Sequence, residues 1–178
     1  KGGTGGLDGE QFSISTAGGD DTLNGNGALS VYFESGAGND RLTGTSGADY
    51  LNAGSGNNVV NGGNGDDTIY AEFGNNRISA GSGNDNIRIN TLTNASDSIK
   101  GRFTLDGGAG TDVATINREG ATANLTFKLA ASATLVNGGV TLESIERVSI
   151  TTGSGRDRLT GGALADSLSG GSGADTLT

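Results

Sequence analysis

One feature constrains this chain more than any other: a nine-residue period that runs without a break through residues 35–88. In each unit of this block, an acidic or amide residue follows a glycine by two positions and precedes an aliphatic residue by two positions. The period returns in residues 152–178. A short fixed period is typical of a solenoid, in which each repeat packs only against its neighbours. The acidic or amide residues, called reference residues below, are Asp40, Asp49, Asn58, Asp67, Asn76, Asp85, Asp157, Asp166 and Asp175.

Each unit divides into a turn and a very short strand. The first six positions, such as GGNGDD at residues 62–67, are mostly small or polar, and glycine reaches positive φ without steric cost. The last three positions, such as residues 68–70, alternate outward, inward and outward, so one aliphatic side chain per unit is buried. This alternation predicts an all-β solenoid: a flattened coil with two sheets and two turn edges. Two units complete one coil.

The two-unit coil places every second unit on the same edge. One edge is predicted to carry Asp49, Asp67 and Asp85, and the other Asp40, Asn58 and Asn76. Paired strands lie roughly 4.8 Å apart, so stacked carboxylates repel one another unless a cation separates them. Carboxylate and carbonyl oxygens suit Ca²⁺, which takes about 6–8 oxygen ligands. We therefore predict calcium sites on the first edge and weak or vacant sites at the neutral Asn58 and Asn76.

Several units resemble a known family. GGNGDDTIY at residues 62–70, AGSGNDNIR at 80–88 and GGSGADTLT at 170–178 are similar to the nonapeptide of the RTX, or hemolysin-type calcium-binding, repeat. Clear repeats cover a little under half of the chain. The resemblance implies a parallel β-roll, several calcium ions held in the turns, and export by a type I secretion system.

The predicted ligand set also includes units outside the regular blocks. Residues 18–23 and 107–114 repeat the motif, although Ala114 stands where a larger aliphatic residue is expected. Leu164 stands where a turn glycine is expected, which puts a site at Asp166 in doubt. The predicted calcium ligands are the side chains of Asp21, Asp40, Asp49, Asp67, Asp85, Asp112, Asp157, Asp166 and Asp175 and the backbone carbonyls of Gly47, Gly63, Gly65, Gly81, Gly83, Gly153, Gly155, Gly171 and Gly173.

The regularity of the repeats and the local composition divide the chain into four segments. Residues 1–34 are degraded coils, 35–88 the main repeat block, 89–151 an inserted loop followed by wider β coils, and 152–178 a second repeat block. Because the step from Asp21 to Asp40 exceeds two units by one position, we expect a bulge or longer loop near residues 28–34. The wider coils should have a metal-free hydrophobic core and a turn at residues 137–139, while Asp97 in the inserted loop is a weak calcium candidate.

Other interpretations of the repeats are a flexible Gly/Asn/Ser linker and a β-solenoid held by asparagine ladders without metal. A linker has no reason to place an aliphatic residue at every ninth position. The asparagine ladder stays open for the edge with Asn58 and Asn76. Glu72, which replaces a small turn residue, is either a substitute ligand on that edge or a solvated acid.

Composition narrows the possible functions. The 178 residues carry a formal net charge of −9, which argues against nucleic acid and anionic membranes as partners. The chain has no His and no Cys, so the usual general base and thiol nucleophile are missing, and we expect no enzymatic activity. The lack of Cys also excludes a disulfide scaffold, and no apolar run approaches membrane-spanning length.

We therefore expect a calcium-binding structural module of a secreted or cell-surface bacterial RTX protein, of adhesin or surface-layer type, that folds outside the cell. The alternative is the carrier module of an enzyme or toxin exported by type I secretion. Ice binding is disfavoured because the outward positions 41, 43, 50, 52, 68 and 70 form no regular threonine array. Besides calcium, the expected partner is further chain or a second molecule that continues the solenoid beyond Thr178.

Overall fold

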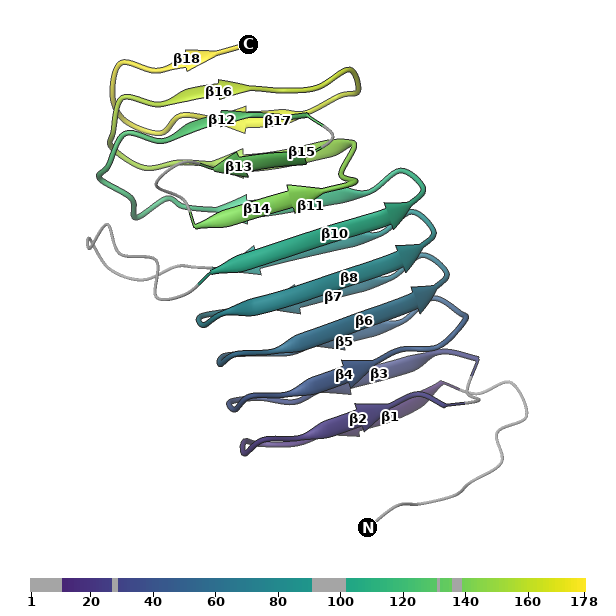
Figure 1. Cartoon of the computed structure of the whole chain (residues 1–178). Coiled ribbons are helices and arrows are strands. Elements are labelled where there is room, and N and C mark those ends of the chain that lie inside the picture. The colour runs from purple at the N-terminus through teal and green to yellow at the C-terminus, as the bar shows by residue number, and fades with distance from the viewer. Residues whose placement is uncertain (1–10, 27–28, 91–101, 131, 136–138) are drawn as a thin grey trace.

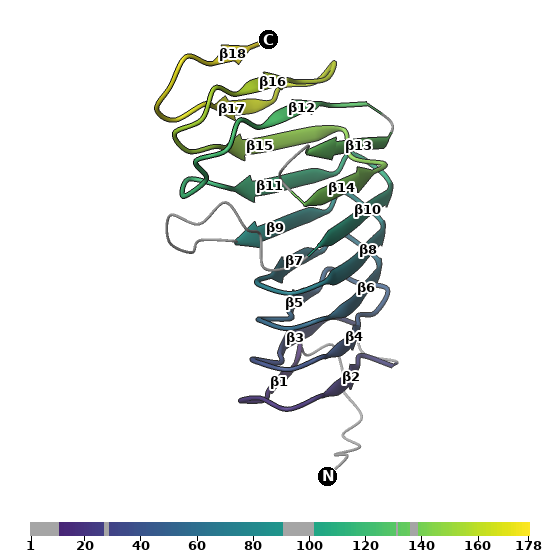
Figure 2. The same cartoon turned by 60° about the vertical axis from the view of Figure 1, so that its left-hand side comes forward.

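The computed structural model describes residues 11–26, 29–90, 102–130, 132–135 and 139–178. The chain winds into a stack of flattened coils, with the first strand (Phe12–Ser15) and the last (Thr176–Leu177) at opposite ends of the stack (Figures 1 and 2). All of the regular elements in these residues are β-strands, which confirms the predicted all-β solenoid. None of the described residues belongs to a helix long and apolar enough to cross a membrane.

Three sheets form the walls of the stack. The first contains, in spatial order, β1 (Phe12–Ser15), β3 (Val31–Glu34), β5 (Tyr50–Asn52), β7 (Thr68–Ala71), β9 (Asn86–Asn90), β11 (Val113–Asn117), β15 (Arg147–Thr151) and β17 (Ser167–Ser169). The second contains β13 (Ser132–Leu135), β14 (Val140–Glu143), β10 (Phe103–Ala109), β8 (Asn76–Ser82), β6 (Val59–Asn64), β4 (Arg41–Thr43) and β2 (Thr22–Asn24). The third, at the C-terminal end, contains β12 (Thr126–Lys128), β16 (Arg158–Thr160) and β18 (Thr176–Leu177). The paired strands are parallel except for β13 and β14, which are antiparallel.

The strand register confirms the predicted coil of two units. In the first sheet Leu51 pairs with Ile69, which pairs in turn with Ile87. In the second sheet Val60 pairs with Ile78. All five side chains are buried, as the alternation predicted. The core of the repeat block is thus a column of stacked aliphatic side chains between two sheets.

The first coil holds one extra residue. The step along the chain from Leu23 to its partner Leu42 is one position longer than the step from Phe33 to its partner Leu51. The extra residue therefore lies between β2 and β3, just before Val31, where the sequence predicted a bulge or longer loop. Residues 27–28 of this connection lie outside the described residues.

The regular period ends at β9. Ala114 pairs with Ile87, three units away instead of two, and the next step, from Ala114 to its partner Val148, is longer still. The predicted inserted loop, with Asp97, and the predicted turn at 137–139 fall largely on residues 91–101 and 136–138, outside the described residues. The first sheet nevertheless runs on without interruption from β9 through β11 and β15 to β17.

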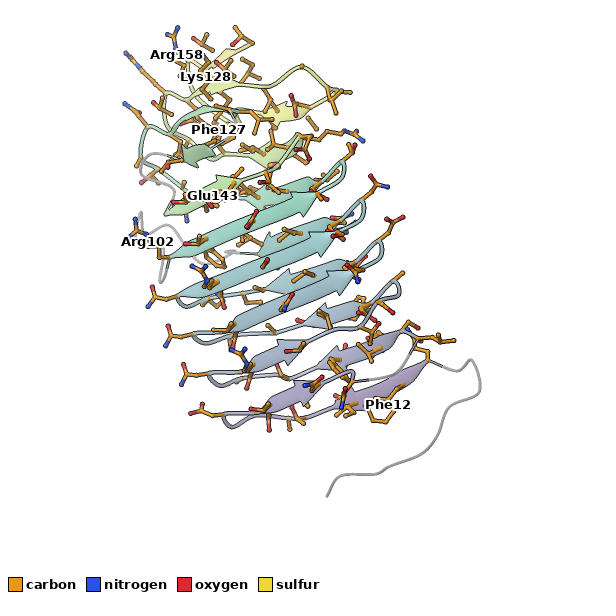
Figure 3. The ribbon with its side chains drawn as sticks, turned by 45° about the vertical axis from the view of Figure 1, so that its right-hand side comes forward. Phe12, Arg102, Phe127, Lys128, Glu143 and Arg158 are labelled. Atoms are coloured by element: carbon orange, nitrogen blue, oxygen red, sulfur yellow. The ribbon has the colours of Figure 1, made fainter. Side chains whose placement is uncertain are left out.

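A second inward position of the first sheet carries a larger residue from β9 onward. It is alanine directly after β5 and in β7 (Ala53 and Ala71) and isoleucine in β9, β11 and β15 (Ile89, Ile116 and Ile150). Phe127 is buried near the C-terminal end, whereas Phe12 lies half-buried at the other end of the stack (Figure 3). Apolar packing therefore increases where the repeat motif fades.

An aromatic ladder lies on the outer face of the first sheet. The Tyr32 and Tyr50 rings are stacked with centroids 4.4 Å apart, and the Tyr70 ring follows 5.2 Å from that of Tyr50. The Arg88 guanidinium lies over the Tyr70 ring, 5.6 Å from its centroid. At the other end, the Tyr32 hydroxyl donates a 2.7 Å hydrogen bond to Glu34. This ladder links successive coils without using the turns.

Candidate metal sites

The turns of the coils form two edges. The turns that lead from the second sheet into the first end on one set of reference residues and define the aspartate edge: Asp49, Asp67, Asp85 and Asp112. The turns that lead from the first sheet into the second define the mixed edge: Asp21, Asp40, Asn58 and Asn76. The structure thus separates the reference residues of the main block as the two-unit coil predicted.

The reference residues stack by a hydrogen bond from coil to coil. Along the aspartate edge, Oδ1 of each aspartate accepts a hydrogen bond from the backbone N–H of the reference position one coil earlier. The N···O distances are 2.8 Å from Asp49 to Asp67, 2.8 Å from Asp67 to Asp85, and 2.8 Å from Asp85 to Asp112. Asp112 therefore continues the edge although it lies three units after Asp85.

The second carboxylate oxygen has no such partner at three of these positions. Oδ2 of Asp67, Asp85 and Asp112 is buried without a hydrogen bond from any described residue. A buried, unpaired carboxylate oxygen is costly unless the group is protonated or a cation lies beside it. Each of these oxygens is therefore a candidate metal ligand.

The electrostatics of the edge lead to the same conclusion. Burial, together with the neighbouring carboxylates of Asp49, Asp85 and Asp66, raises the pKa of Asp67 to about 7, against the hydrogen bond from the Asp49 backbone. Burial, with Asp85 and other acids, raises the pKa of Asp112 to about 6, and burial also raises the pKa of Asp85. A bound divalent cation would favour the charged form of all three groups.

Glycines leave room for these oxygens. A Cβ on Gly62 would collide with both Asp67 Oδ2 and the carbonyl oxygen of Ala80 in the next coil. A carboxylate oxygen and a main-chain carbonyl oxygen therefore converge beside the α-carbon of Gly62. Gly63 and Gly65 in the same turn adopt positive φ of 116° and 98°, which an L-side chain rarely tolerates.

Asp49 differs from the other members of its edge. Its Oδ2 accepts hydrogen bonds from the backbone N–H of Thr45 at 2.5 Å and from the Thr45 hydroxyl at 3.1 Å. Thr45 stands where the regular turns have glycine, as at Gly63. The protein itself thus satisfies the carboxylate that ends the edge on the N-terminal side.

On the mixed edge, asparagine supplies donors in place of a cation. Asn58 Nδ2 donates to the carbonyls of Ala53 and Gly54 at 3.0 and 3.4 Å, and Asn76 Nδ2 donates to the carbonyls of Glu72 and Gly74 at 2.9 and 3.2 Å. Oδ1 of each asparagine makes the same coil-to-coil bond as the aspartates. These two turns are therefore closed by their own side chains. The Glu72 side chain, a possible ligand on this edge, is exposed.

The two aspartates of the mixed edge keep an unpaired oxygen. Asp40 Oδ1 accepts a hydrogen bond from the Asp21 backbone at 2.9 Å, one coil earlier. Oδ2 of both Asp21 and Asp40 is buried without a hydrogen bond in the described part of the chain. Among its four reference residues, the mixed edge thus offers unpaired carboxylate oxygens only at its N-terminal end.

The second repeat block forms a shorter version of the same ladder. Leu125 N–H donates to Asp157 Oδ1 at 2.8 Å, and Asp157 N–H donates to Asp175 Oδ1 at 2.9 Å. Asp166 lies on the other edge, where Val148 N–H donates to its Oδ1 and Gly162 N–H to its Oδ2. Asp157 keeps a buried, unpaired Oδ2, whereas both oxygens of Asp166 accept hydrogen bonds from the protein.

The predicted carbonyl ligands come from two positions of the turn. The first position is two residues before the aspartate, at Gly47, Gly65, Gly83, Gly155 and Gly173. In the described residues, these carbonyls accept none of the hydrogen bonds found outside the strands. The others (Gly63, Gly81, Gly153 and Gly171) are four residues before it, and the Gly153 carbonyl accepts a hydrogen bond from Ser172 N–H at 2.8 Å. Because a carbonyl oxygen has two lone pairs, such a bond leaves a position for a cation.

Carboxylates alone do not complete a site. The described residues contain no group of three or more Asp or Glu side chains arranged to hold a metal. A cation on either edge would need main-chain carbonyls besides the stacked aspartates. This donor set, with hard oxygens and no nitrogen or sulfur, fits Ca²⁺.

Comparison with protein families agrees with this geometry. The model of the RTX calcium-binding nonapeptide repeat matches residues 34–69, 53–87 and 149–178. This chain carries RTX repeats. The RTX matches include every reference residue from Asp40 to Asp85 and from Asp157 to Asp175. A comparison with curated proteins found no match.

Sequence reasoning missed two features that lie outside the RTX matches. It did not place Asp112 on the aspartate edge, because Asp112 lies three units after Asp85 and an odd number of units suggests the opposite edge. It also overlooked Glu146, whose Oε2 accepts a hydrogen bond from Asp112 N–H at 2.8 Å. The only signal for Glu146 was its position two residues before the core residue Val148, the spacing of a repeat aspartate.

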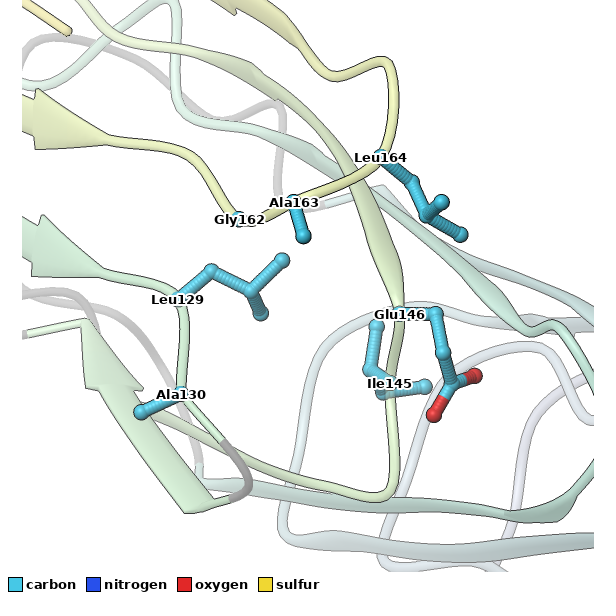
Figure 4. A pocket seen from close by; sticks show the side chains of 7 residues that line it. All are labelled: Leu129, Ala130, Ile145, Glu146, Gly162, Ala163 and Leu164. Carbon is cyan, nitrogen blue, oxygen red and sulfur yellow. The ribbon is translucent and has the colours of Figure 1, made fainter.

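A shallow pocket lies where the RTX coils meet the wider coils, close to Glu146. It has a volume of about 290 Å³ and is lined by Leu129, Ala130, Ile145, Glu146, Gly162, Ala163 and Leu164 (Figure 4). Its only ionisable lining residue is Glu146. Polar groups that could activate a substrate do not converge there, so the pocket does not suggest a catalytic centre.

Proposed function

We propose that the chain is a calcium-dependent structural module of a secreted or cell-surface RTX protein, of adhesin or surface-layer type. The observation that supports this proposal is the row of buried aspartates whose second oxygens have no hydrogen-bond partner among the described residues. RTX repeats are calcium-binding repeats, so a cation would complete the coordination of these oxygens. Calcium would thereby hold together coils that repel each other without it.

The energetics of such sites are large enough to control folding. Extracellular calcium modules bind with Kd of about 10⁻⁴–10⁻³ M. At a tenfold excess of calcium over Kd, one site stabilises the folded state by about 1.4 kcal/mol, so about four to six sites contribute roughly 6–8 kcal/mol. This is comparable to the whole stability of a small domain. We therefore propose that the module is largely unfolded inside the cell and folds in millimolar calcium outside it.

No catalytic role is included in this proposal. The recurring side chains are explained as turn, core or ligand residues, and the long outer faces are suited to a spacer or scaffold. A carrier module of an exported enzyme or toxin would use the same calcium-dependent folding. The two differ in the rest of the gene product, where a carrier requires a catalytic or lytic domain and a nearby secretion signal.

Circular dichroism of the chain in EDTA and in millimolar calcium tests calcium-dependent folding. We expect a disordered spectrum in the chelator and a β-rich spectrum in calcium, because metal binding provides much of the folding free energy. Magnesium at the same concentration is the control, since it tolerates less irregular coordination. Identical folded spectra with and without calcium would refute the proposal.

A further inference from the structure

The aspartate edge continues past the last repeat turn into an irregular one. The turn at residues 107–112 connects Asp106 to Val113, and its neighbour in the next coil, residues 144–146, connects Glu143 to Arg147. The two turns join paired positions of the same two sheets. The turn at residues 144–146 therefore connects the two sheets with three residues, where the turn at residues 107–112 uses six.

Glu146 takes the position of a repeat aspartate in this shorter turn. Its Oε2 accepts a hydrogen bond from the Asp112 backbone N–H at 2.8 Å, as Asp112 Oδ1 does from Asp85 N–H. The side chain of glutamate is one methylene longer than that of aspartate. The longer side chain lets the carboxylate reach the previous coil although the turn that carries it is shorter.

A main-chain carbonyl completes the resemblance to a repeat site. A Cβ on Gly107 would collide with the Ser144 carbonyl oxygen and would crowd Asp112 Oδ2. The same pair of atoms, a carboxylate Oδ2 and a carbonyl of the next coil, converges on Gly62 in the repeat block. Ser144 has φ of 50°, the one positive φ found at a non-glycine residue of the described chain, so this carbonyl is held by a strained backbone.

The environment of Asp112 disfavours an unpaired negative charge. Asp112 is fully buried, and its Oδ2 has no hydrogen-bond partner in the described residues. Burial raises its pKa most, and the neighbouring carboxylates of Asp85, Glu146 and Asp106 raise it further. In Figure 4 the Glu146 carboxylate points away from Leu129 and Ala163, so it does not point into the apolar pocket beside it.

We propose that Asp112, Glu146 and the Ser144 carbonyl bind a calcium ion at the junction between the repeat block and the wider coils. Two of its ligands, Glu146 and Ser144, lie outside the nonapeptide turns, and the glutamate takes the place of a repeat aspartate. The inference rests on the proposed calcium binding for the identity of the ion. Bound there, calcium ties the wider, more apolar coils to the end of the aspartate edge.

Native mass spectrometry and calorimetry of the whole chain with calcium chloride test this site. We expect Glu146→Gln to bind one calcium ion fewer than the wild type, or to bind one ion at least tenfold more weakly. Glutamine keeps an oxygen acceptor for Asp112 N–H, so the loss of charge is the main change. Glu143→Gln, an exposed glutamate three residues away, is the matched control and should bind as the wild type does.

Comparing the wild type, Asp67→Asn and Glu146→Gln distinguishes failure of this site from failure of calcium binding as a whole. If the wild type binds no calcium, the proposed function fails. If Asp67→Asn loses calcium but Glu146→Gln keeps the wild-type number and affinities, only the junction site is overturned. Should Glu146→Gln not fold, a trace of paramagnetic Mn²⁺ added to the folded, calcium-saturated, glutamate-labelled wild type decides: broadening of the Glu146 carboxylate ¹³C resonance without broadening of Glu143 supports the site, and equal signals from the two residues overturn it.

Discussion

The backbone N–H of Asp67 donates a 2.8 Å hydrogen bond to Oδ1 of Asp85, in the next coil. One residue earlier in each turn, the hydrogen bond between the coils runs the other way: Asn84 N–H donates to Asp66 Oδ1 at 2.7 Å. On the mixed edge, Asn57 N–H likewise donates to Asn39 Oδ1 at 3.0 Å. Side-chain oxygens thus join adjacent turns in both directions, which fixes their register. On the aspartate edge these bonds use only one oxygen of Asp67 and of Asp85 and leave the other for a cation.

The metal-free fold should become more stable as the pH falls. The pKa of Asp67 is raised from 3.8 to about 7 and that of Asp112 to about 6, so the folded chain binds more protons than the unfolded chain between pH 3.8 and 7. Stability then decreases as the pH rises through this window. Circular dichroism in chelator should show a larger folded fraction at pH 5 than at pH 7.5. In calcium the Tm should instead be higher at pH 7.5, since calcium needs the charged carboxylates; equal folded fractions in chelator at both pH values would contradict the burial argument.

Asp67→Asn should have opposite effects with and without calcium. The new Nδ2 can donate to turn carbonyls, as Asn58 does, and the buried charge is removed. We expect the folded fraction in EDTA to rise, by the equivalent of about 1–2 kcal/mol of free energy, and calcium binding to weaken. Circular dichroism in EDTA and calorimetry measure the two effects. Asp66→Asn, at the exposed neighbouring position, should change neither by a comparable amount.

The reverse substitutions should create calcium ligands on the mixed edge. In Asn58→Asp/Asn76→Asp the amide donors that close the turns are lost, and two buried carboxylates stack beside Asp40. Native mass spectrometry should detect additional calcium, while the fold in EDTA should be weaker. The matched control is Asn57→Asp/Asn75→Asp, which adds the same charge at exposed positions. An equal gain of calcium in the control would show that charge alone, not the turn, binds the ion.

Tyr50→Ala should destabilise the stack without changing calcium stoichiometry. Tyr50 is the middle ring of the aromatic ladder, and each aromatic contact contributes about 0.5–1.5 kcal/mol beyond burial. We therefore expect a lower Tm in saturating calcium and the same number of bound ions by calorimetry. Thr68→Ala, on the same face of the neighbouring strand, should have a smaller effect. Loss of calcium in Tyr50→Ala would mean that the ladder and the turns do not act separately.

The sequence alone determined the regular part of this molecule. The nine-residue period predicted the two-unit coil, the buried column of Leu51, Ile69 and Ile87, and the separation of Asp67 from Asn58 onto opposite edges. This was possible because each repeat interacts only with the coils before and after it. Its neighbours therefore lie at a fixed distance along the chain.

Only the tertiary structure decided what happens where the period is interrupted. Asp112 returns to the edge of Asp85 although the number of units between them predicts the other side, and Glu146 stacks onto Asp112 across a longer and irregular connection. An insertion of arbitrary length resets the phase of the coil, so sequence spacing no longer identifies the neighbour. The pairing of β9, β11 and β15 in one sheet brings these acids together, because hydrogen bonding between strands fixes the register whatever the length of the connection.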